Sequence, residues 1–282
     1  MSVRKIVEDV FSVGSIDWDR RLFDELIPLP EGTTYNSYLI RGTEKTALID
    51  TVDPLKKQEL LNNIGELQIS GIDYIIVNHA EQDHSGSIGS IFELFPQSKV
   101  ICSPKCADLL TEHLLIDSAR IISVGDGQTI SLGNKTLRFI SAAWVHWPET
   151  MLTYLEEDCI LFPCDLFGSH YASSALFARR LPEIYIAAKR YYAEIMMPFR
   201  HLIKKHLQKI DSLQIALIAA SHGPIYDQPD FIIDAYKEWT SDDVKEEVVV
   251  PYVSMHGSVK SMVDHFIEAL IKKDLTVKPF NL

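Results

Sequence analysis

The chain has 282 residues, with 27 lysines and arginines against 39 aspartates and glutamates, which gives a formal net charge of −12. Ordinary apolar content predicts a folded core, and the length suits one large domain or a domain with an appendage. The acidic balance argues against a general nucleic-acid-binding surface. No apolar run approaches the roughly 18 residues of a membrane span, and the N-terminus lacks a secretory signal. We therefore expect a cytoplasmic protein with no membrane span.

The predicted elements alternate between strands and helices in the first half of the chain. Strands are expected within 32–40, 46–50, 72–77 and 98–102, and helices within 55–67, 88–95 and 105–114. Later strands are expected at 120–124, 128–130, 136–141, 151–155, 159–163 and 214–220, with hairpin turns at 125–127 and 132–134 and a helix over 182–207. Two such halves predict two sheets face to face with helices outside, an α/β sandwich.

The four cysteines fit a reducing compartment as free thiols. Cys102 and Cys106, four residues apart, are also compatible with a metal or redox pair. We interpret all four, including Cys159 and Cys164, as buried structural residues, because free cysteine packs as a small apolar side chain.

The short stretch His79-Ala-Glu-Gln-Asp-His84 carries four side chains that can donate a lone pair to a metal. It follows the apolar run 72–77, which is typical of a buried strand, and precedes a helix-start signal. If the chain stays extended past that strand, His79, Glu81 and Asp83 share one face, with His84 beside them. A polar surface loop is the alternative for this stretch taken alone.

Three further donors each come after a predicted strand. They are His146, Asp165 and His222. Taken singly, each is more typical of a hydrogen-bonded structural residue. Loops at one edge of a rigid sheet are where functional groups gather, so we expect all three to join the first cluster as metal ligands.

These residues resemble the metallo-β-lactamase-fold domain of flavodiiron proteins over roughly the first 240 positions. The shared motifs are His79-x-Glu-x-Asp-His84, Trp-Val-His146-Trp-Pro-Glu-Thr, Pro-Cys-Asp165-Leu-Phe-Gly and Ser-His222-Gly-Pro. The resemblance implies an αββα sandwich that holds two non-haem irons. It also implies that one iron binds His79, Glu81 and His146, that the other binds Asp83, His84 and His222, and that Asp165 bridges them.

Zinc hydrolases of this fold usually have a histidine where this chain has Glu81. Exchanging an imidazole for a hard carboxylate shifts the metal preference from zinc towards iron or manganese, so a zinc hydrolase is the least favoured interpretation. Two Fe(II) ions and three carboxylates leave a charge of about +1, which accepts an anionic oxygen ligand. Each iron is left short of six ligands, so a diatomic molecule fits between them. We expect no catalytic residues beyond the metal ligands.

The last residues resemble the start of a flavodoxin domain, which follows the metal domain in flavodiiron proteins and carries FMN. Residues 248–259 resemble its first strand and phosphate loop, and 259–271 its first helix, but Val259 replaces the usual phosphate-binding threonine. About 35 residues cannot close a five-stranded sheet. We therefore expect a metallo-β-lactamase-like diiron domain over 1–244 and a truncated flavodoxin-like tail over 245–282, without FMN.

Two Fe(II) ions supply two electrons, whereas reduction of dioxygen to water takes four. The first hypothesis is therefore a diiron protein that binds dioxygen, persists in an oxo-, hydroxo- or peroxo-bridged diferric state, and reports oxygen or iron status to a signalling protein. The alternative is an oxygen or nitric oxide reductase that receives electrons from an external rubredoxin- or flavodoxin-like protein. The resemblance also allows a homodimer, because the family is usually a head-to-tail dimer.

Several other residues near these motifs are interpreted separately. His170 fits either a position beside a ligand or a structural role. Trp147, Phe167 and Tyr191 are better explained as core than as walls of an oxygen pocket. Asp24 stands where the family often has a histidine close to the irons. The remaining histidines have no donors grouped around them and are interpreted as non-ligands: His113, His201, His206, His256 and His265.

Overall fold

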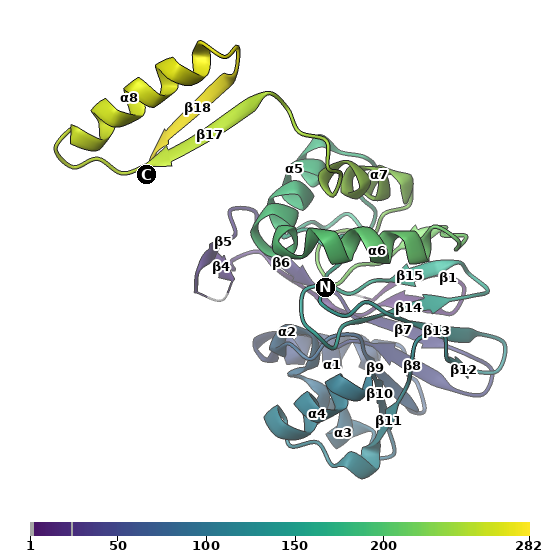
Figure 1. Cartoon of the computed structure of the whole chain (residues 1–282). Coiled ribbons are helices and arrows are strands. Elements are labelled where there is room, and N and C mark those ends of the chain that lie inside the picture. Colours follow the sequence, from purple (N-terminus) through teal and green to yellow (C-terminus); the bar gives the residue numbers. More distant parts are fainter. Residues whose placement is uncertain (1–2, 24) are drawn as a thin grey trace. The chain divides into compact units, whose positions relative to one another are not determined.

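The computed structural model describes residues 3–23 and 25–282, so Asp24 lies outside the described residues. The chain divides into two compact units, Met1–Thr240 and Ser241–Leu282. In the first unit two β-sheets stack face to face, and helices cover both outer sides (Figure 1). This is the αββα sandwich that the order of predicted elements indicates. No helix among the described residues has the length and apolar character needed to cross a bilayer.

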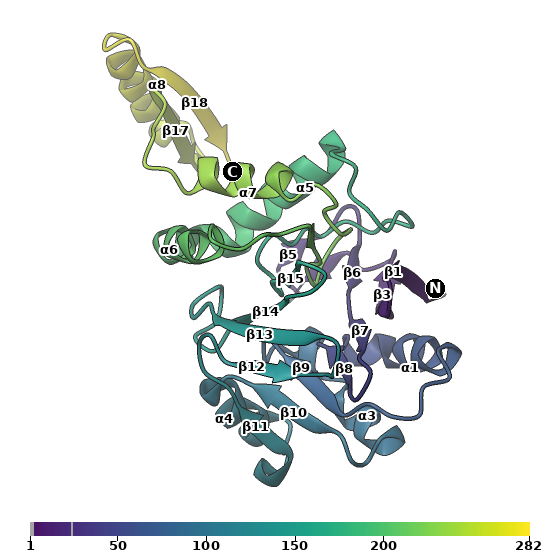
Figure 2. The ribbon, with the colours of Figure 1, turned by 90° about the vertical axis from the view of Figure 1, so that its right-hand side faces the viewer.

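The larger sheet has seven strands, and its central strands run parallel. In spatial order they are β1 (Arg4–Val7), β2 (Val10–Ser12), β7 (Tyr38–Arg41), β8 (Thr46–Ile49), β9 (Tyr74–Val77), β10 (Lys99–Cys102) and β11 (Ile121–Ser123). The helices on its outer face are α1 (Lys57–Glu66), α3 (Ile88–Leu94) and α4 (Pro104–His113) (Figure 2).

The smaller sheet has five strands, mostly antiparallel, with one parallel pair at its edge. In spatial order they are β12 (Thr129–Ser131), β13 (Thr136–Ser141), β14 (Met151–Leu155), β15 (Ile160–Phe162) and β16 (Leu217–Ile218). The helices on its outer face are α5 (Pro182–Tyr191), α6 (Arg200–Ile210) and α7 (Asp230–Trp239). Short antiparallel pairs complete the unit: β3 (Ser15–Asp17) with β6 (Thr33–Tyr35), and β4 (Leu22–Phe23) with β5 (Ile27–Pro28).

Apolar side chains fill three layers of the first unit. Between the sheets, Tyr38 and Ile76 pack with Phe139 and Phe162, and the ring centroids of Tyr38 and Phe162 are 5.2 Å apart. The second and third layers lie between each sheet and its own helices. Because β8, β9 and β10 are covered on both faces, their sequences are apolar apart from Thr46 and Lys99, which begin β8 and β10. This packing fixes the strand ends from which the functional loops emerge.

Two predicted strand connections differ from the structure. The run 32–40 forms two strands, β6 and β7, which belong to different sheets because the chain turns at Asn36 and Ser37. The turn predicted as a hairpin at 125–127 connects β11 to β12, and so it crosses from one sheet to the other. The turn at 132–134 closes the β12–β13 hairpin, as predicted.

The long helix predicted over 182–207 is broken. A π-helix (Tyr192–Met196) and a 3₁₀-helix (Met197–Phe199) separate α5 from α6. Pro198 lies in this break, and proline cannot donate the backbone hydrogen bond that a continuous helix needs. Of the strand predicted over 214–220, only Leu217–Ile218 forms a regular strand. The Ala219 N–H still donates to the Leu161 carbonyl oxygen of β15 at 2.8 Å, whereas the Ala220 carbonyl oxygen accepts hydrogen bonds from Asn36 and Tyr38.

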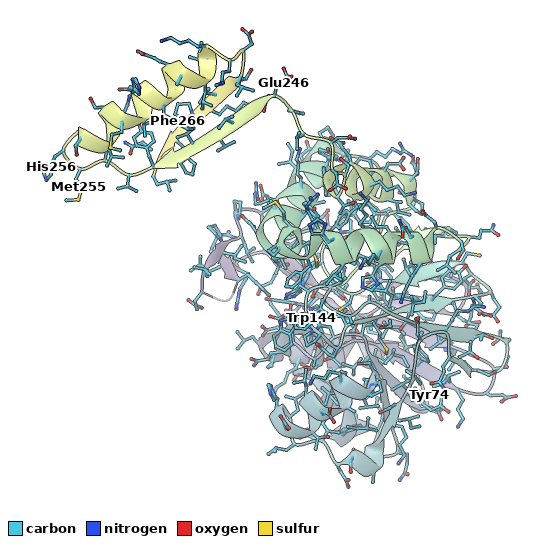
Figure 3. The ribbon with its side chains drawn as sticks, in the orientation of Figure 1. Tyr74, Trp144, Glu246, Met255, His256 and Phe266 are labelled. Carbon is cyan, nitrogen blue, oxygen red and sulfur yellow. The ribbon has the colours of Figure 1, made fainter. Side chains whose placement is uncertain are left out.

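The second unit consists of two parallel strands and one helix. β17 (Glu247–Tyr252) pairs with β18 (Thr276–Asn281), and α8 (Ser258–Ile271) lies between them in sequence. Met255 and His256 lie in the turn between β17 and α8 (Figure 3). Gly257 precedes the helix with φ of 82°, a left-handed conformation that glycine adopts without strain.

Asn36 connects the turn between β6 and β7 to the loop after β16. Its side-chain amide donates to the carbonyl oxygens of Ala220, at 2.8 Å, and Gly223, at 2.7 Å. Its backbone N–H donates to the carbonyl oxygen of Ser221 at 2.8 Å. The Tyr38 hydroxyl donates to the same Ala220 carbonyl at 2.6 Å. The loop that contains His222 is therefore positioned by residues from the start of the chain.

Replacing Asn36 with alanine is expected to lower the unfolding free energy of the metal-free chain by about 1 to 3 kcal/mol, because two hydrogen bonds are lost. Denaturant unfolding followed by circular dichroism measures this change. The control is Asn62→Ala on the exposed face of α1, which should change stability by less than about 0.5 kcal/mol. Equal stabilities of the two variants would show that the Asn36 bonds do not hold the loop.

Candidate metal centre

The first group of predicted ligands lies at the carboxyl end of β9. His79 follows the strand by two residues, and Glu81 precedes α2 (Gln82–Ser85), a single helical turn. Asp83 and His84 lie within that turn. The predicted extended conformation is therefore wrong beyond Glu81, and Asp83 does not alternate with the two residues before it. The helical turn instead directs Asp83 and His84 to a different set of donors.

The other three predicted ligands come from strand ends of the smaller sheet. His146 lies in the loop between β13 and β14, Asp165 follows β15, and His222 follows β16. The structure brings all seven side chains into two groups, and within each group one donor atom per residue lies within 4.8 Å of the others. The groups are His79, Glu81, His146 and Asp165 on one side, and Asp83, His84 and His222 on the other.

The carboxylate of Asp165 connects the two groups. Its Oδ1 lies 3.2 Å from Nε2 of His84 and 3.3 Å from Nε2 of His222. Its Oδ2 lies 3.3 Å from Nε2 of His146 and 3.6 Å from Nε2 of His79. All four imidazoles therefore present the same nitrogen to one carboxylate, with one oxygen facing each group.

The chemistry of these atoms fits a pair of metal ions. Both carboxylate oxygens of Asp83, Nε2 of His84 and Oδ1 of Asp165 are buried and lack a hydrogen-bond partner. They lie close together, with His84 Nε2 3.2 Å from Asp83 Oδ1, but not in hydrogen-bonding geometry. Buried polar atoms without a partner are costly, and lone pairs that converge on a common space are satisfied by cations.

The carboxylates of the site raise the pKa values of its histidines. Burial lowers the pKa of His222, but contacts with Asp165 and Asp83 outweigh burial and raise it to about 10. Burial also opposes protonation of His146, and contacts with Asp165 and Glu81 raise its pKa to about 9. In the same way, burial opposes ionisation of Asp165, but the positive charge of the surrounding imidazoles lowers its pKa. Without metal, the site is a network of ion pairs.

Two residues that sequence reasoning missed hold the far nitrogens of two candidate ligand histidines, His79 and His222. Glu149 Oε1 lies 2.6 Å from His79 Nδ1, and the carbonyl oxygen of Thr34 lies 2.6 Å from His222 Nδ1. Glu149 lies three positions after His146, in a loop already singled out, so a carboxylate there was the available signal. Thr34 contributes its backbone carbonyl oxygen, which every residue type has, so the sequence could not point to it.

The neighbouring aromatic residues have different roles. The Trp147 ring lies edge-on to His79, with centroids 5.1 Å apart, so it packs against the site. Tyr191 and His170 lie 4.9 Å apart, and His170 packs 4.8 Å from His222 and bonds through Nδ1 to the Thr33 hydroxyl at 2.8 Å. Phe167 is fully buried in the core, as predicted.

None of the five histidines interpreted as non-ligands joins a donor group among the described residues. All four cysteines are free; three are buried, but Cys159 is partly exposed, so its predicted burial is wrong. Cys164 lies beside His84 and Asp165 in a third group of donors. Burial raises the pKa of its thiol, which keeps it protonated and makes it a poor ligand.

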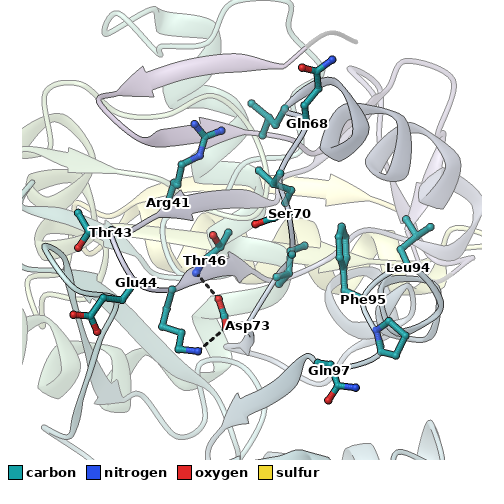
Figure 4. A pocket seen from close by; sticks show the side chains of 17 residues that line it. Arg41, Thr43, Glu44, Thr46, Gln68, Ser70, Asp73, Leu94, Phe95 and Gln97 are labelled. Carbon is teal, nitrogen blue, oxygen red and sulfur yellow. Dashed lines mark hydrogen bonds and ion pairs between the residues drawn. The ribbon is translucent and has the colours of Figure 1, made fainter.

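A cavity of about 760 Å³ lies near the amino-terminal ends of β8, β9 and β10 (Figure 4). It is lined by residues 41–46, 67–73 and 94–97, which include no histidine or cysteine. Asp73 spans part of its wall, because its carboxylate binds Lys45 at 2.8 Å and the Thr46 N–H at 2.9 Å. The candidate metal ligands that follow β9 lie at the opposite, carboxyl end of that strand.

Residues 33–223 match the family described as ODP family beta lactamase. The chain is 37% identical to the nitric oxide reductase of Moorella thermoacetica over 98% of this chain and 71% of that protein. The rubredoxin oxygen:oxidoreductase of Desulfovibrio gigas superposes with a TM-score of 0.90 at 30% identity, covering 99% of this chain and 71% of that one. The flavodiiron protein of Giardia intestinalis gives 0.89 at 29% identity, covering 100% and 70%.

The sandwich and its donor groups at one sheet edge define a metallo-β-lactamase-like α/β protein. The chain belongs to the ODP family of this fold, together with the flavodiiron proteins, so the resemblance found in the sequence is confirmed.

The raised pKa values predict a pH dependence of the metal-free chain. His146 and His222 hold protons up to about pH 9 and 10, whereas unfolded histidine releases its proton near 6.5. Their stabilising contribution should be complete below pH 6.5 and should be lost as the pH rises through 9 and 10. Bound metal displaces these protons, so the decline should be absent with Fe(II) under argon. Thermal unfolding with chelator and with Fe(II) across this range measures both; equal declines would contradict the prediction.

Proposed function

We propose that the seven donors hold two non-haem iron ions and that the chain binds dioxygen, with nitric oxide as the alternative ligand. The observation that carries the proposal is the carboxylate of Asp165, whose two oxygens face separate donor groups. Two ferrous ions supply two electrons and open coordination positions for a diatomic molecule. The residues that would hold them are His79, Glu81 and His146 for one ion, Asp83, His84 and His222 for the other, and Asp165 as the bridge.

The donor set favours iron over zinc. Each group contains a carboxylate of its own, Glu81 or Asp83, in addition to the shared Asp165. Hard carboxylate oxygens beside imidazoles suit iron or manganese, whereas structural zinc sites are richer in thiolates and imidazoles. A hydrolytic zinc site is therefore the less favoured interpretation of the same geometry.

Burial restricts what can reach the site. The side chains of Glu81 and His146 are 13% and 15% exposed, whereas the other five donors are at most 6% exposed. Access is therefore from the side of Glu81 and His146, where Trp147 packs beside them at 6.4 Å from the His146 ring. Such restricted exposure suits a small neutral molecule such as dioxygen or nitric oxide better than a bulky substrate.

Two functions are compatible with the same site, and they differ in whether another protein supplies it with electrons. The names of the relatives, a nitric oxide reductase and a rubredoxin oxygen:oxidoreductase, support a reductase that takes electrons from an external protein. A sensor of oxygen or iron that signals to a partner protein would instead use the two electrons of the irons once. The two differ in whether the oxidised site is reduced again when a donor protein is present.

The Fe(II)-loaded chain is expected to contain about two irons and to react with dioxygen on rapid mixing under otherwise anaerobic conditions. Repeated oxygen consumption with reduced rubredoxin would identify the reductase, and a single oxidation that persists with the donor present would identify the sensor. Two tightly bound zinc ions with esterase or β-lactamase activity would overturn both.

The variant Asp165→Asn is expected to lose at least one iron per chain, because the amide cannot supply two anionic oxygens to two ions. Metal analysis after anaerobic gel filtration measures the loss. The control is Asp211→Asn, which removes an exposed ion pair with Lys237 and should leave both irons bound. Full iron content in the Asp165 variant would exclude a bridging role.

We also propose that residues 245–282 are flavodoxin-like but do not bind FMN. The parallel pair β17 and β18 with α8 between them supports the fold assignment. Val259, in the first turn of α8, offers no hydroxyl to a phosphate. The fluorescence of free FMN is therefore expected to stay unquenched on titration with the chain; quenching at one equivalent would refute the proposal.

A further inference from the structure

We infer that Glu149 is a positioning residue that makes the two metal-binding halves chemically unequal, so that its negative charge strengthens binding of the ion held by His79, Glu81 and His146. This inference rests on the proposed diiron function. It goes beyond the ligand set, because Glu149 touches no donor atom that faces the metals. Its target is the opposite nitrogen of the His79 ring.

The contacts of Glu149 fix His79 in one orientation. Glu149 Oε1 lies 2.6 Å from His79 Nδ1 and also accepts the Ala80 backbone N–H at 3.0 Å. Both side chains are fully buried. With Nδ1–H donating to the carboxylate, Nε2 is the nitrogen left to bind a metal, and it faces Glu81, 3.0 Å away, and Asp165.

The backbone around Glu149 is held as firmly as its side chain. Its carbonyl oxygen accepts a hydrogen bond from the Ser103 hydroxyl at 2.7 Å, next to the start of α4. The same loop carries His146 and Trp147, and the Trp147 ring packs edge-on against His79. One loop therefore supplies a ligand, a packing surface and the carboxylate behind a second ligand of the same ion.

The other half of the site has a neutral counterpart. His222 Nδ1 faces the carbonyl oxygen of Thr34 at 2.6 Å, and this backbone group carries no net charge. A carboxylate partner increases the basicity of a ligand imidazole more than a carbonyl does, and it adds a negative charge near the ion. The charge of Glu149 therefore favours the ion near His79, both in affinity and in its oxidised state.

A purely structural role for Glu149 makes a different prediction. Its Oε2 is buried and has no hydrogen-bond partner, so the carboxylate is held at some desolvation cost. A glutamine has the same shape, keeps an oxygen for the Ala80 N–H and removes the charge. If only packing mattered, that substitution would leave metal binding unchanged.

The experiment isolates each half of the site by removing one ligand from the other. In the His222→Ala background, the intact half contains His79, and adding Glu149→Gln should weaken Fe(II) binding by about 10- to 100-fold. In the His146→Ala background, the intact half contains His222, and the same addition should change Fe(II) affinity by less than about 2-fold. Anaerobic calorimetric titration of the full chain with Fe(II) measures all four affinities.

A second readout does not depend on affinity. In the otherwise native chain, Glu149→Gln should raise the reduction potential of the iron near His79, because a negative charge close to that iron is lost. The control is Glu156→Gln, which makes the same chemical change at the Arg138 ion pair and should leave both readouts unaltered.

Equal Fe(II) affinity with and without Glu149→Gln in the His222→Ala background would overturn the inference while leaving the diiron proposal intact. Equal weakening in both backgrounds would also overturn it, because the effect would then be general. Failure of the native chain to bind two irons would refute the proposed function itself, and with it this inference.

Discussion

A buried carboxylate among four imidazoles is the constraint on which the rest of the site depends. Asp165 is 1% exposed, and an ionised group at that depth is tolerated only when opposite charge or metal surrounds it. Its two oxygens face two different groups of histidines. The loops after β9, β13, β15 and β16 must therefore converge on one point, and the sandwich provides rigid strand ends from which they do so.

The second requirement is that each imidazole keeps one orientation. His79 is held by Glu149 from the neighbouring ligand loop, and His222 by the backbone of Thr34. Gly223 makes the latter contact possible, because its φ of 83° turns the chain and a Cβ there would lie 2.1 Å from Ser169 Oγ. The backbone N–H of Gly223 donates to the Thr34 hydroxyl at 2.7 Å. Outer contacts of this kind determine which lone pair is offered to a metal.

Periodicity and motif spacing were enough to predict the sandwich and to single out the seven donors that the structure brings together. Predictions from local sequence were wrong where the backbone conformation depends on residues far away in the chain. Asp83 was expected on an extended chain but lies in a helical turn, and the helix expected over 182–207 breaks near Pro198. Glu149 was missed because its partner lies 70 residues away, and Thr34 because its backbone binds a residue 188 positions later.

The donors are spread from residue 79 to residue 222, across both sheets. Only His79, Glu81, Asp83 and His84 are neighbours in an unfolded chain, so neither donor group is complete until the two sheets have packed together. Contacts that form last leave the rate of folding nearly unchanged and slow the reverse reaction. If the seven donors hold iron as proposed, the ions would bind only after the two sheets have packed, so the chain would fold without them and, once loaded, would resist opening and proteolysis for longer.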